Sequence, residues 1–173
     1  MSELDEAWAA ALAEAELKAR RAGRGDVADY LALRNSNDLL RTAGIDWLLA
    51  SFMNLAGDAN RAGASIQLSR SEGHRFHIGS STMVGRLVTL TNGVRRLSIE
   101  AGWPRVPRDG FIRGGGLAAG HILHLGIRSA SDELLLSKAP AGAPQWTLIN
   151  RNRTILHESH IRRHLQILLD LPQ

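Results

Sequence analysis

The spacing of apolar residues changes at Ala64, and this change limits the possible folds more than any other feature of the chain. Before Ala64, apolar residues recur every three or four positions, which is typical of one face of a helix. After it they recur every second position, as in strands, and only the last segment returns to helical spacing. This order predicts an α+β fold, in which N-terminal helices precede a mostly antiparallel multi-stranded sheet and a C-terminal helix packs on one sheet face.

Three helices are expected before the sheet. The first covers residues 3–22 and has a narrow, alanine-rich apolar face, so we interpret residues 1–22 as a helical arm. A short second helix begins at Asp26, and the polar run NSND at 35–38 separates it from a third helix at 38–62. The third has the broad apolar face of a helix that packs on a sheet, made of Leu40, Ala43, Trp47, Leu48, Ser51, Phe52, Leu55 and Ala59.

Eight segments have the alternating pattern of strands. They are residues 66–70, 75–79, 83–91, 94–101, 117–126, 133–138, 145–150 and 154–158. Asn92 and Gly93 lie between two of these runs and give the strongest short-range signal for a hairpin. A two-residue turn at this pair aligns Val88 with Leu97, on an apolar face that we expect to meet the third helix.

The chain closes with an expected helix at residues 160–171, which Ser159 is placed to cap. Its buried stripe is expected to be Ile161, Leu165 and Leu168. No internal repeat or low-complexity linker interrupts the sequence. Residues 1–173 are therefore predicted to form a single domain.

Basic residues are concentrated after residue 63. Residues 1–63 contain 7 Lys and Arg against 10 Asp and Glu, whereas residues 64–173 contain 14 against 7. Of the 21 basic residues, all but Lys18 and Lys138 are arginine, whose planar guanidinium binds phosphate or carboxylate through two hydrogen bonds. Codon bias can explain the preference for arginine, but it cannot explain why the charge is uneven along the chain. The second part of the chain is therefore expected to attract anionic partners.

The segment GWPRVPRDGFIRGGG, residues 102–116, is the longest stretch without a strand pattern in this basic part. A glycine run can turn several N–H groups toward an anion, and flanking arginines add charge-assisted hydrogen bonds. Neither the Walker P-loop nor the GxGxxG spacing is present, and a structural crossover with solvent-facing arginines is the alternative. The predicted anion-binding residues are Arg105, Arg108, Arg113, Gly114, Gly115 and, on the sheet, Arg96.

Two functions fit these features. The leading hypothesis is a non-enzymatic binding or assembly module, in which the arginine-rich sheet and loop bind an anionic partner, nucleic acid being one such partner. The alternative is a small enzyme or ligand-binding domain with a phosphate or carboxylate in a pocket roofed by residues 102–116, where Glu100 and Asp109 could act as acid and base. Glu100 is more simply expected to pair with Arg96 or an arginine on a neighbouring strand. The N-terminal helix is a candidate contact for a homo-oligomer or a protein partner.

The histidines suggest a metal site but do not support one. All seven fall in pairs three residues apart: His74/His77, His121/His124, and His157/His160 extended by His164. Residues three apart on a strand point to opposite faces, so neither of the first two pairs can chelate one ion unless a turn or bulge intervenes. On the last helix, Arg162 and Arg163 lie between His160 and His164 and would repel a cation. We therefore predict no metal and no cofactor, and we expect the helix-start histidines to form local hydrogen bonds.

Cysteine is absent, which excludes disulfides and thiolate chemistry and is typical of a cytoplasmic protein. The first residues, MSELDEAWAAALAEAE, lack the basic start and apolar run of a signal peptide. No apolar stretch approaches the roughly 18 residues of a membrane span. A cytoplasmic protein without a membrane contact is expected.

Overall fold

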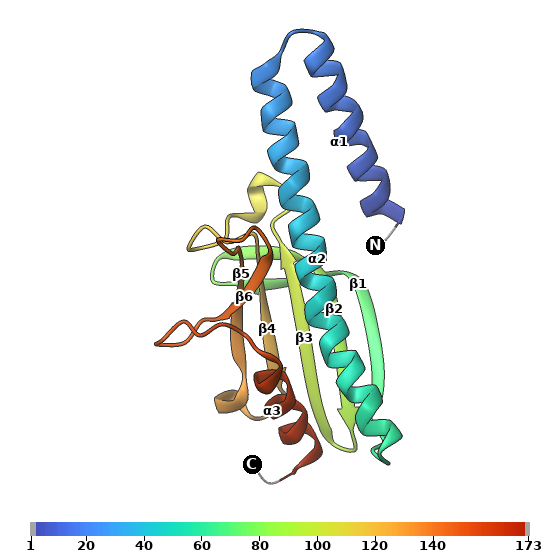
Figure 1. Ribbon diagram of the computed structural model, residues 1–173. Coiled ribbons are helices and arrows are strands. Elements are labelled where there is room, and N and C mark those ends of the chain that lie inside the picture. The colour runs from blue at the N-terminus through green and yellow to red at the C-terminus, as the bar shows by residue number, and fades with distance from the viewer. Residues whose placement is uncertain (1–2, 172–173) are drawn as a thin grey trace. The chain divides into compact units, whose positions relative to one another are not determined.

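A computed structural model describes residues 3–171, with side chains described from Glu6 onward; residues 1 and 2 of the predicted arm lie outside this range. The chain divides into two compact units, Met1–Ala43 and Gly44–Gln173. In the first unit, α1 (Glu3–Arg21) and the beginning of α2 (Gly25–Arg61) run side by side as a helical hairpin (Figure 1). The second unit contains the rest of α2, the sheet and α3 (Glu158–Leu169).

The predicted break in the helix at residues 35–38 is wrong, because α2 continues through it as one helix of 37 residues. Asn, Ser and Asp have modest helix propensity, but unlike proline they keep the backbone N–H and the ladder of hydrogen bonds continues. The predicted inner stripe of this helix also needs correction. Trp47 is 47% exposed, and the buried positions are Ile45, Leu48, Leu49, Phe52 and Ala56. Apolar residues lie on both sides of the helix here, so their spacing alone did not identify the buried side.

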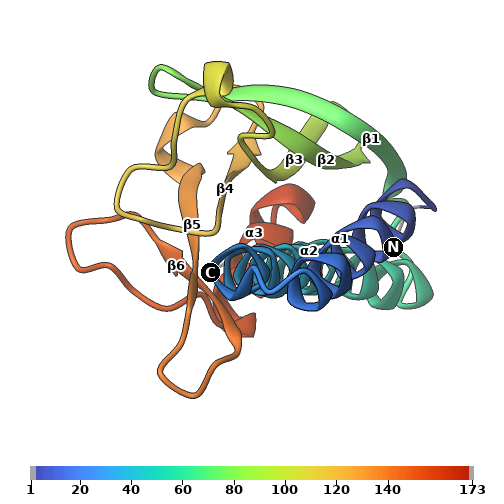
Figure 2. The same cartoon turned by 90° about the horizontal axis from the view of Figure 1, so that it is seen from above.

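The second unit contains a six-stranded, fully antiparallel sheet in which each strand pairs with the next along the chain. The strands are β1 (Gln67–Ile78), β2 (Ser81–Asn92), β3 (Arg95–Trp103), β4 (Ala118–His124), β5 (Asp132–Lys138) and β6 (Pro144–Leu148). Figure 2 shows them curving around α3. We call the face with Val88, Leu97 and Ile99 the inner face, because these residues form one core with Phe52 of α2 and Ile161 of α3. The opposite face is the outer face. The predicted α+β arrangement is confirmed.

Two predicted strands are in fact one. Residues 66–70 and 75–79 belong to β1, which continues through a bulge between Glu72 and His74. Gly73 lies at the bulge with φ of +64°, a conformation that favours glycine. The predicted strand at 154–158 is reduced to a single bridge between Thr147 and Ile155, because α3 begins at Glu158.

The β2–β3 hairpin forms as predicted, but the predicted register is wrong. Val88 aligns with Ile99 instead of Leu97, so that the two turn residues are Gly93 and Val94. Only Gly93 of this pair has a positive φ, at +60°. A turn with glycine first and an ordinary residue second matches type II′, whereas Asn-Gly would have formed type I′. The shift changes each partner by two residues, so the predicted inner and outer faces are preserved.

The buried stripe of α3 is confirmed: Ile161, Leu165 and Leu168 are all buried. The helix begins at Glu158, two residues before the predicted start, and its cap is His157 and not Ser159. The backbone N–H of His157 donates to His160 Nδ1 at 3.0 Å, which confirms the predicted local hydrogen bond at the helix start.

Candidate functional site

Residues of the predicted loop connect β3 to β4 and fold against the end of the β1–β2 hairpin. Ser81 Oγ donates to the carbonyl of Phe111 at 2.8 Å and accepts from the Phe111 N–H at 3.3 Å. Further along the loop, Ile112 packs against the apolar cluster of Phe76 and Met83 on the outer face. Ile112 is half-buried, and Phe76 and Met83 are buried, so this contact anchors the loop to the sheet.

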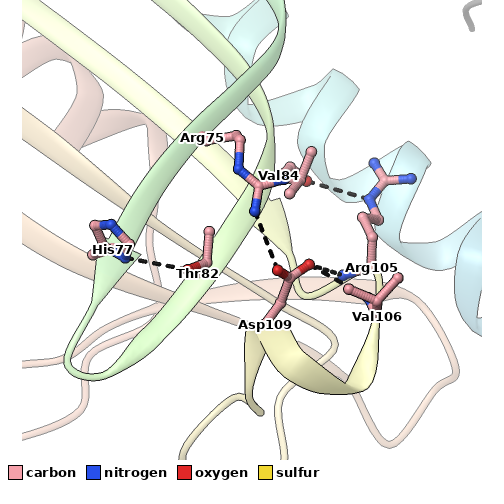
Figure 3. Close-up of polar contacts among 7 residues, drawn as sticks. All are labelled: Arg75, His77, Thr82, Val84, Arg105, Val106 and Asp109. Carbon is pink, nitrogen blue, oxygen red and sulfur yellow. Dashed lines mark hydrogen bonds and ion pairs between the residues drawn. The ribbon is translucent and has the colours of Figure 1, made fainter.

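Asp109 organises the first part of the loop from within. Its carboxylate is 5% exposed, and it accepts hydrogen bonds from Arg75 Nη2 at 3.2 Å and from the backbone N–H groups of Arg105 and Val106 at 3.2 and 3.4 Å. Figure 3 shows these donors around the two carboxylate oxygens. Burial by itself would raise the pKa of Asp109, but the backbone hydrogen bonds and the Arg75 charge outweigh it and lower the pKa. Asp109 is therefore an ionised anchor for the loop.

Three predicted arginines of the loop are held in different ways. The Arg105 guanidinium lies 3.5 Å from the centre of the Trp103 ring, and its Nε donates to the carbonyl of Val84 at 3.3 Å. Arg108 is exposed on the short 3-10 helix Pro107–Asp109. The exposed Arg113 lies against the β1–β2 turn, with its guanidinium carbon 3.8 Å from the position of a Cβ on Gly79. Stacking on an aromatic ring and a backbone hydrogen bond restrict Arg105, whereas Arg108 and Arg113 are exposed.

The remaining predicted site residues are placed differently. Gly114 and Gly115 follow the arginines with positive φ values of +83° and +71°. Arg96 lies at the opposite end of β3 from the loop, about 23 Å away at roughly 3.3 Å per residue. Arg75 joins the loop arginines instead, through Asp109. Only the folded chain reveals this role, because Arg75 lies 34 residues before its partner.

One aromatic ring is exposed among these arginines. Phe111 is 74% exposed, although its backbone is fixed by Ser81 on both sides. It lies between Arg108 and Arg113 in the sequence, so an exposed aromatic ring and two exposed arginines share one anchored segment. We call Arg75, Arg105, Arg108, Phe111 and Arg113 the loop surface.

A second polar cluster occupies the outer face of the sheet. Glu100, 8% exposed, accepts a hydrogen bond from His74 Nε2 at 2.7 Å and another from His121 Nδ1 at 2.8 Å. The predicted arginine partner of Glu100 is therefore wrong. Burial alone would raise the pKa of Glu100, but the hydrogen bonds from the two histidines and their charge lower it.

Glycines let His74 reach Glu100 across an intervening strand. Gly85 on β2 is aligned with His74 on β1 and with Gly102 on β3, the strand that carries Glu100. A Cβ on Gly85 would lie 1.9 Å from the carbonyl oxygen of Ala101, so no side chain fits there. With no side chain at Gly85, the imidazole of His74 crosses β2 and lies 2.7 Å from the Glu100 carboxylate.

A third cluster lies on the inner face, between β4 and α3. His124 Nε2 lies 3.0 Å from His164 Nδ1, and His164 Nε2 lies 3.1 Å from Asp132 Oδ2. The carboxylate can only accept, so His164 donates to it and accepts from His124 through its other nitrogen. His164 is 1% exposed, so its side chain is buried beside the predicted stripe of the helix. Burial, followed by the charges of His124, Arg163 and His160, lowers the pKa of His164 to about 3.

The two histidines of the β4 pair lie on opposite faces of the sheet and contact different groups. His121 contacts Glu100 on the outer face, while His124 contacts His164 on the inner face. Among the described residues, no three His, Asp or Glu side chains are grouped in a way that could hold a metal ion.

Comparisons with protein-family models, with curated proteins and with solved structures find no match for this chain. The functional argument therefore depends on the residues and their geometry. None of the helices within the described residues combines the length and the apolar character that crossing a membrane requires.

Proposed function

We propose that this chain is a non-enzymatic module that binds single-stranded nucleic acid through the loop surface. The observation that carries the proposal is the 74% exposed ring of Phe111 on an anchored segment between two arginines. Proteins that bind single strands combine a cationic path for the backbone with aromatic rings on which bases stack. An unpaired base has an accessible face for such stacking, whereas the bases of a duplex are already stacked on each other.

The charge balance of the loop surface supports an anionic partner. Four arginines lie on or beside the loop, and the carboxylate of Asp109 among them is buried and already hydrogen-bonded to three donors. Arg108 and Arg113 are exposed, so both can be reached by a partner from solvent. Phosphates approaching them would displace counterions, which makes binding depend steeply on salt.

Anchoring by Asp109 and Ser81 favours binding in a second way. A loop that is already ordered loses less conformational entropy when a ligand binds. The loop surface is therefore suited to moderate affinity without a deep pocket. The cysteine-free sequence supports a cytoplasmic setting for this activity.

The proposal is tested by fluorescence anisotropy with labelled single-stranded DNA and RNA and with a duplex of the same sequence. Stacking of a base on an aromatic ring contributes about 1–3 kcal/mol, so Phe111→Ala is expected to weaken single-strand binding by about 5- to 150-fold. Arg108→Ala is expected to lower the salt slope by about 0.7, the value for one lost phosphate contact on a single strand. Arg151→Ala, an exposed arginine in the loop after β6, is the matched control and is expected to have little effect.

Two results would contradict the proposal. One is binding of every probe weaker than about 10⁻⁴ M, the scale of nonspecific association. The other is unchanged single-strand affinity in Phe111→Ala. If inorganic phosphate or a carboxylate raises the melting temperature while nucleic acid does not bind, the small-ligand or enzyme alternative, with residues 102–116 over the pocket, takes its place.

The assembly part of the hypothesis concerns the first unit. Its helices expose Leu17 on α1, and Tyr30 and Leu33 on α2, at 54%, 62% and 62%. Tyr30 and Leu33 are three residues apart and share one face of α2, and large exposed apolar side chains are typical of protein contacts. They support the proposal that the helical hairpin binds a further copy of the chain or another protein.

A further inference from the structure

The edge strand β1 has an unusually open first part. Residues 67–73 are all exposed, so both faces of the strand are open to solvent there. Within the described residues β2 is the only strand paired with β1. An edge strand carries a row of backbone N–H and C=O groups directed away from its sheet, and these groups can pair with another strand.

The other edge strand of the sheet, β6, is covered by the segment that follows it. The segment after β6 folds back along that strand, and the Leu148 N–H donates to the Thr154 carbonyl at 2.8 Å. The Leu156 N–H donates in turn to the Trp146 carbonyl at 2.9 Å. The chain therefore covers the backbone groups of β6 with its own residues, while the first part of β1 has no equivalent cover among the described residues.

The charges on β1 indicate what could pair with it. Arg70 and Glu72 lie two residues apart, so they point to the same face, and no ion pair within the described residues involves either of them. Charged residues usually protect an edge because like charges meet when two copies approach. In this chain, whether like charges meet depends on the register in which the β1 strands of two copies pair.

When two copies pair antiparallel, a twofold axis perpendicular to the sheet keeps the inner faces of both sheets on the same side. The residue at the axis then lies opposite the same residue of the other copy. An axis at Arg70 or at Glu72 places like charges opposite each other, which is unfavourable. An axis at Ser71 places Arg70 of each copy opposite Glu72 of the other. Two oppositely charged cross-strand pairs form in this register, and they lie directly beside the axis.

We propose that the first part of β1 is a self-association surface, at which a second copy of this chain pairs antiparallel about Ser71. The two six-stranded sheets then form one continuous sheet, and the Arg70–Glu72 pairs select the register. This inference is independent of the proposed nucleic-acid binding, because the loop surface uses none of these residues.

Analytical ultracentrifugation of the full chain over a range of concentrations tests the proposal, at about 50 mM salt so that exposed charges are weakly screened. The wild-type chain is expected to form a dimer. Arg70→Glu and Glu72→Arg each place like charges opposite each other at both pairs, and each is expected to raise the dissociation constant about tenfold or more. The double variant with both substitutions restores opposite charges and is expected to recover the wild-type dissociation constant.

Arg151→Glu is the control, because it changes the charge by the same amount as Arg70→Glu at an exposed position far along the chain. Circular dichroism verifies that each variant is folded. A chain that is monomeric at every concentration overturns the proposal. So does a dimer that both single variants leave intact, since its contact then lies elsewhere, for example on the first unit. Failure of the double variant to recover dimerisation refutes the register about Ser71.

Discussion

Mild acid is expected to destabilise the fold through His164. This side chain is 1% exposed between α3 and the inner face, and its pKa falls to about 3 from the ordinary value of 6.5. In the unfolded chain the imidazole titrates normally. The stabilising effect of a neutral His164 is therefore complete above pH 6.5 and is lost as the pH falls from 6.5 toward 3, because the unfolded state binds the proton first.

The size of the effect follows from the difference between the two pKa values. At pH 5 the unfolded imidazole is almost fully protonated and the folded one is not, so the free energy of unfolding falls by about 2 kcal/mol relative to pH 7.5. For a chain of this length that loss lowers the melting temperature by about 4–8 °C. Burial and the Arg163 charge also lower the pKa of His124, which adds to the loss in the same direction.

Urea denaturation at pH 7.5, 6.5, 5.5 and 5.0 measures this loss, which is expected to reach about 2 kcal/mol at pH 5.0 relative to pH 7.5. The pKa values of Glu100 and Asp109 are lowered from 4.5 and 3.8, so the stability that these carboxylates contribute is lost mainly below pH 5, outside this range. His164→Gln keeps hydrogen-bonding groups but cannot take up a proton, and its free energy of unfolding is expected to vary much less with pH.

The comparison is made within each variant, so a lower stability of His164→Gln at neutral pH does not affect it. The exposed His77, which shares a hydrogen bond with Thr82, provides the matched control, and His77→Gln is expected to retain the wild-type dependence. Wild-type stability that stays constant or rises between pH 7.5 and 5 would refute the reasoning. That result would mean that the Asp132 carboxylate, 3.1 Å away, stabilises the charged imidazole more than burial destabilises it.

Two further predictions concern packing of the second unit. Trp146→Phe removes the indole hydrogen bond to the α2 backbone (2.8 Å) and is expected to lower the free energy of unfolding by about 1 kcal/mol. Trp47→Phe, at an exposed position of α2, is the control and is expected to leave the free energy of unfolding nearly unchanged. Equal effects of the two variants in urea denaturation would contradict this prediction. Gly85→Ala forces a methyl group against the Ala101 carbonyl and is expected to destabilise the fold by about 1–3 kcal/mol. Its control is Gly57→Ala on α2, where nothing closer than 3.6 Å opposes a Cβ, and a gain of up to about 1 kcal/mol is expected.

The features that depend on local periodicity could be predicted from the sequence. The inner stripe of α3 and the order of helices and strands follow from apolar spacing alone, because burial on one face imposes that spacing. Register could not be read in this way. Asn92-Gly93 and Gly93-Val94 are both acceptable two-residue turns, and the choice between them places the same residues on the same faces.

The candidate site was only partly predictable for a related reason. The loop and its arginines are contiguous in the sequence, so composition identified them. Arg75 and Ser81 contribute from the β1–β2 hairpin, and their roles follow only from the contacts that the fold creates with Asp109 and Phe111. The misplacement of Arg96 has the opposite cause: it is close to the loop in sequence, but a strand is extended and carries it to the far end of the sheet.

The histidines show how strand geometry assigns side chains that the sequence presents in pairs. Because neighbours three apart on a strand face opposite ways, each strand pair must contribute one imidazole to each face. His121 accordingly joins His74 at Glu100, and His124 meets His164, which comes from the only helical group. His74 and His121 thus come from different pairs, and so do His124 and His164. Spacing along the chain excluded chelation within the strand pairs, but only the order of the strands could determine which histidines meet.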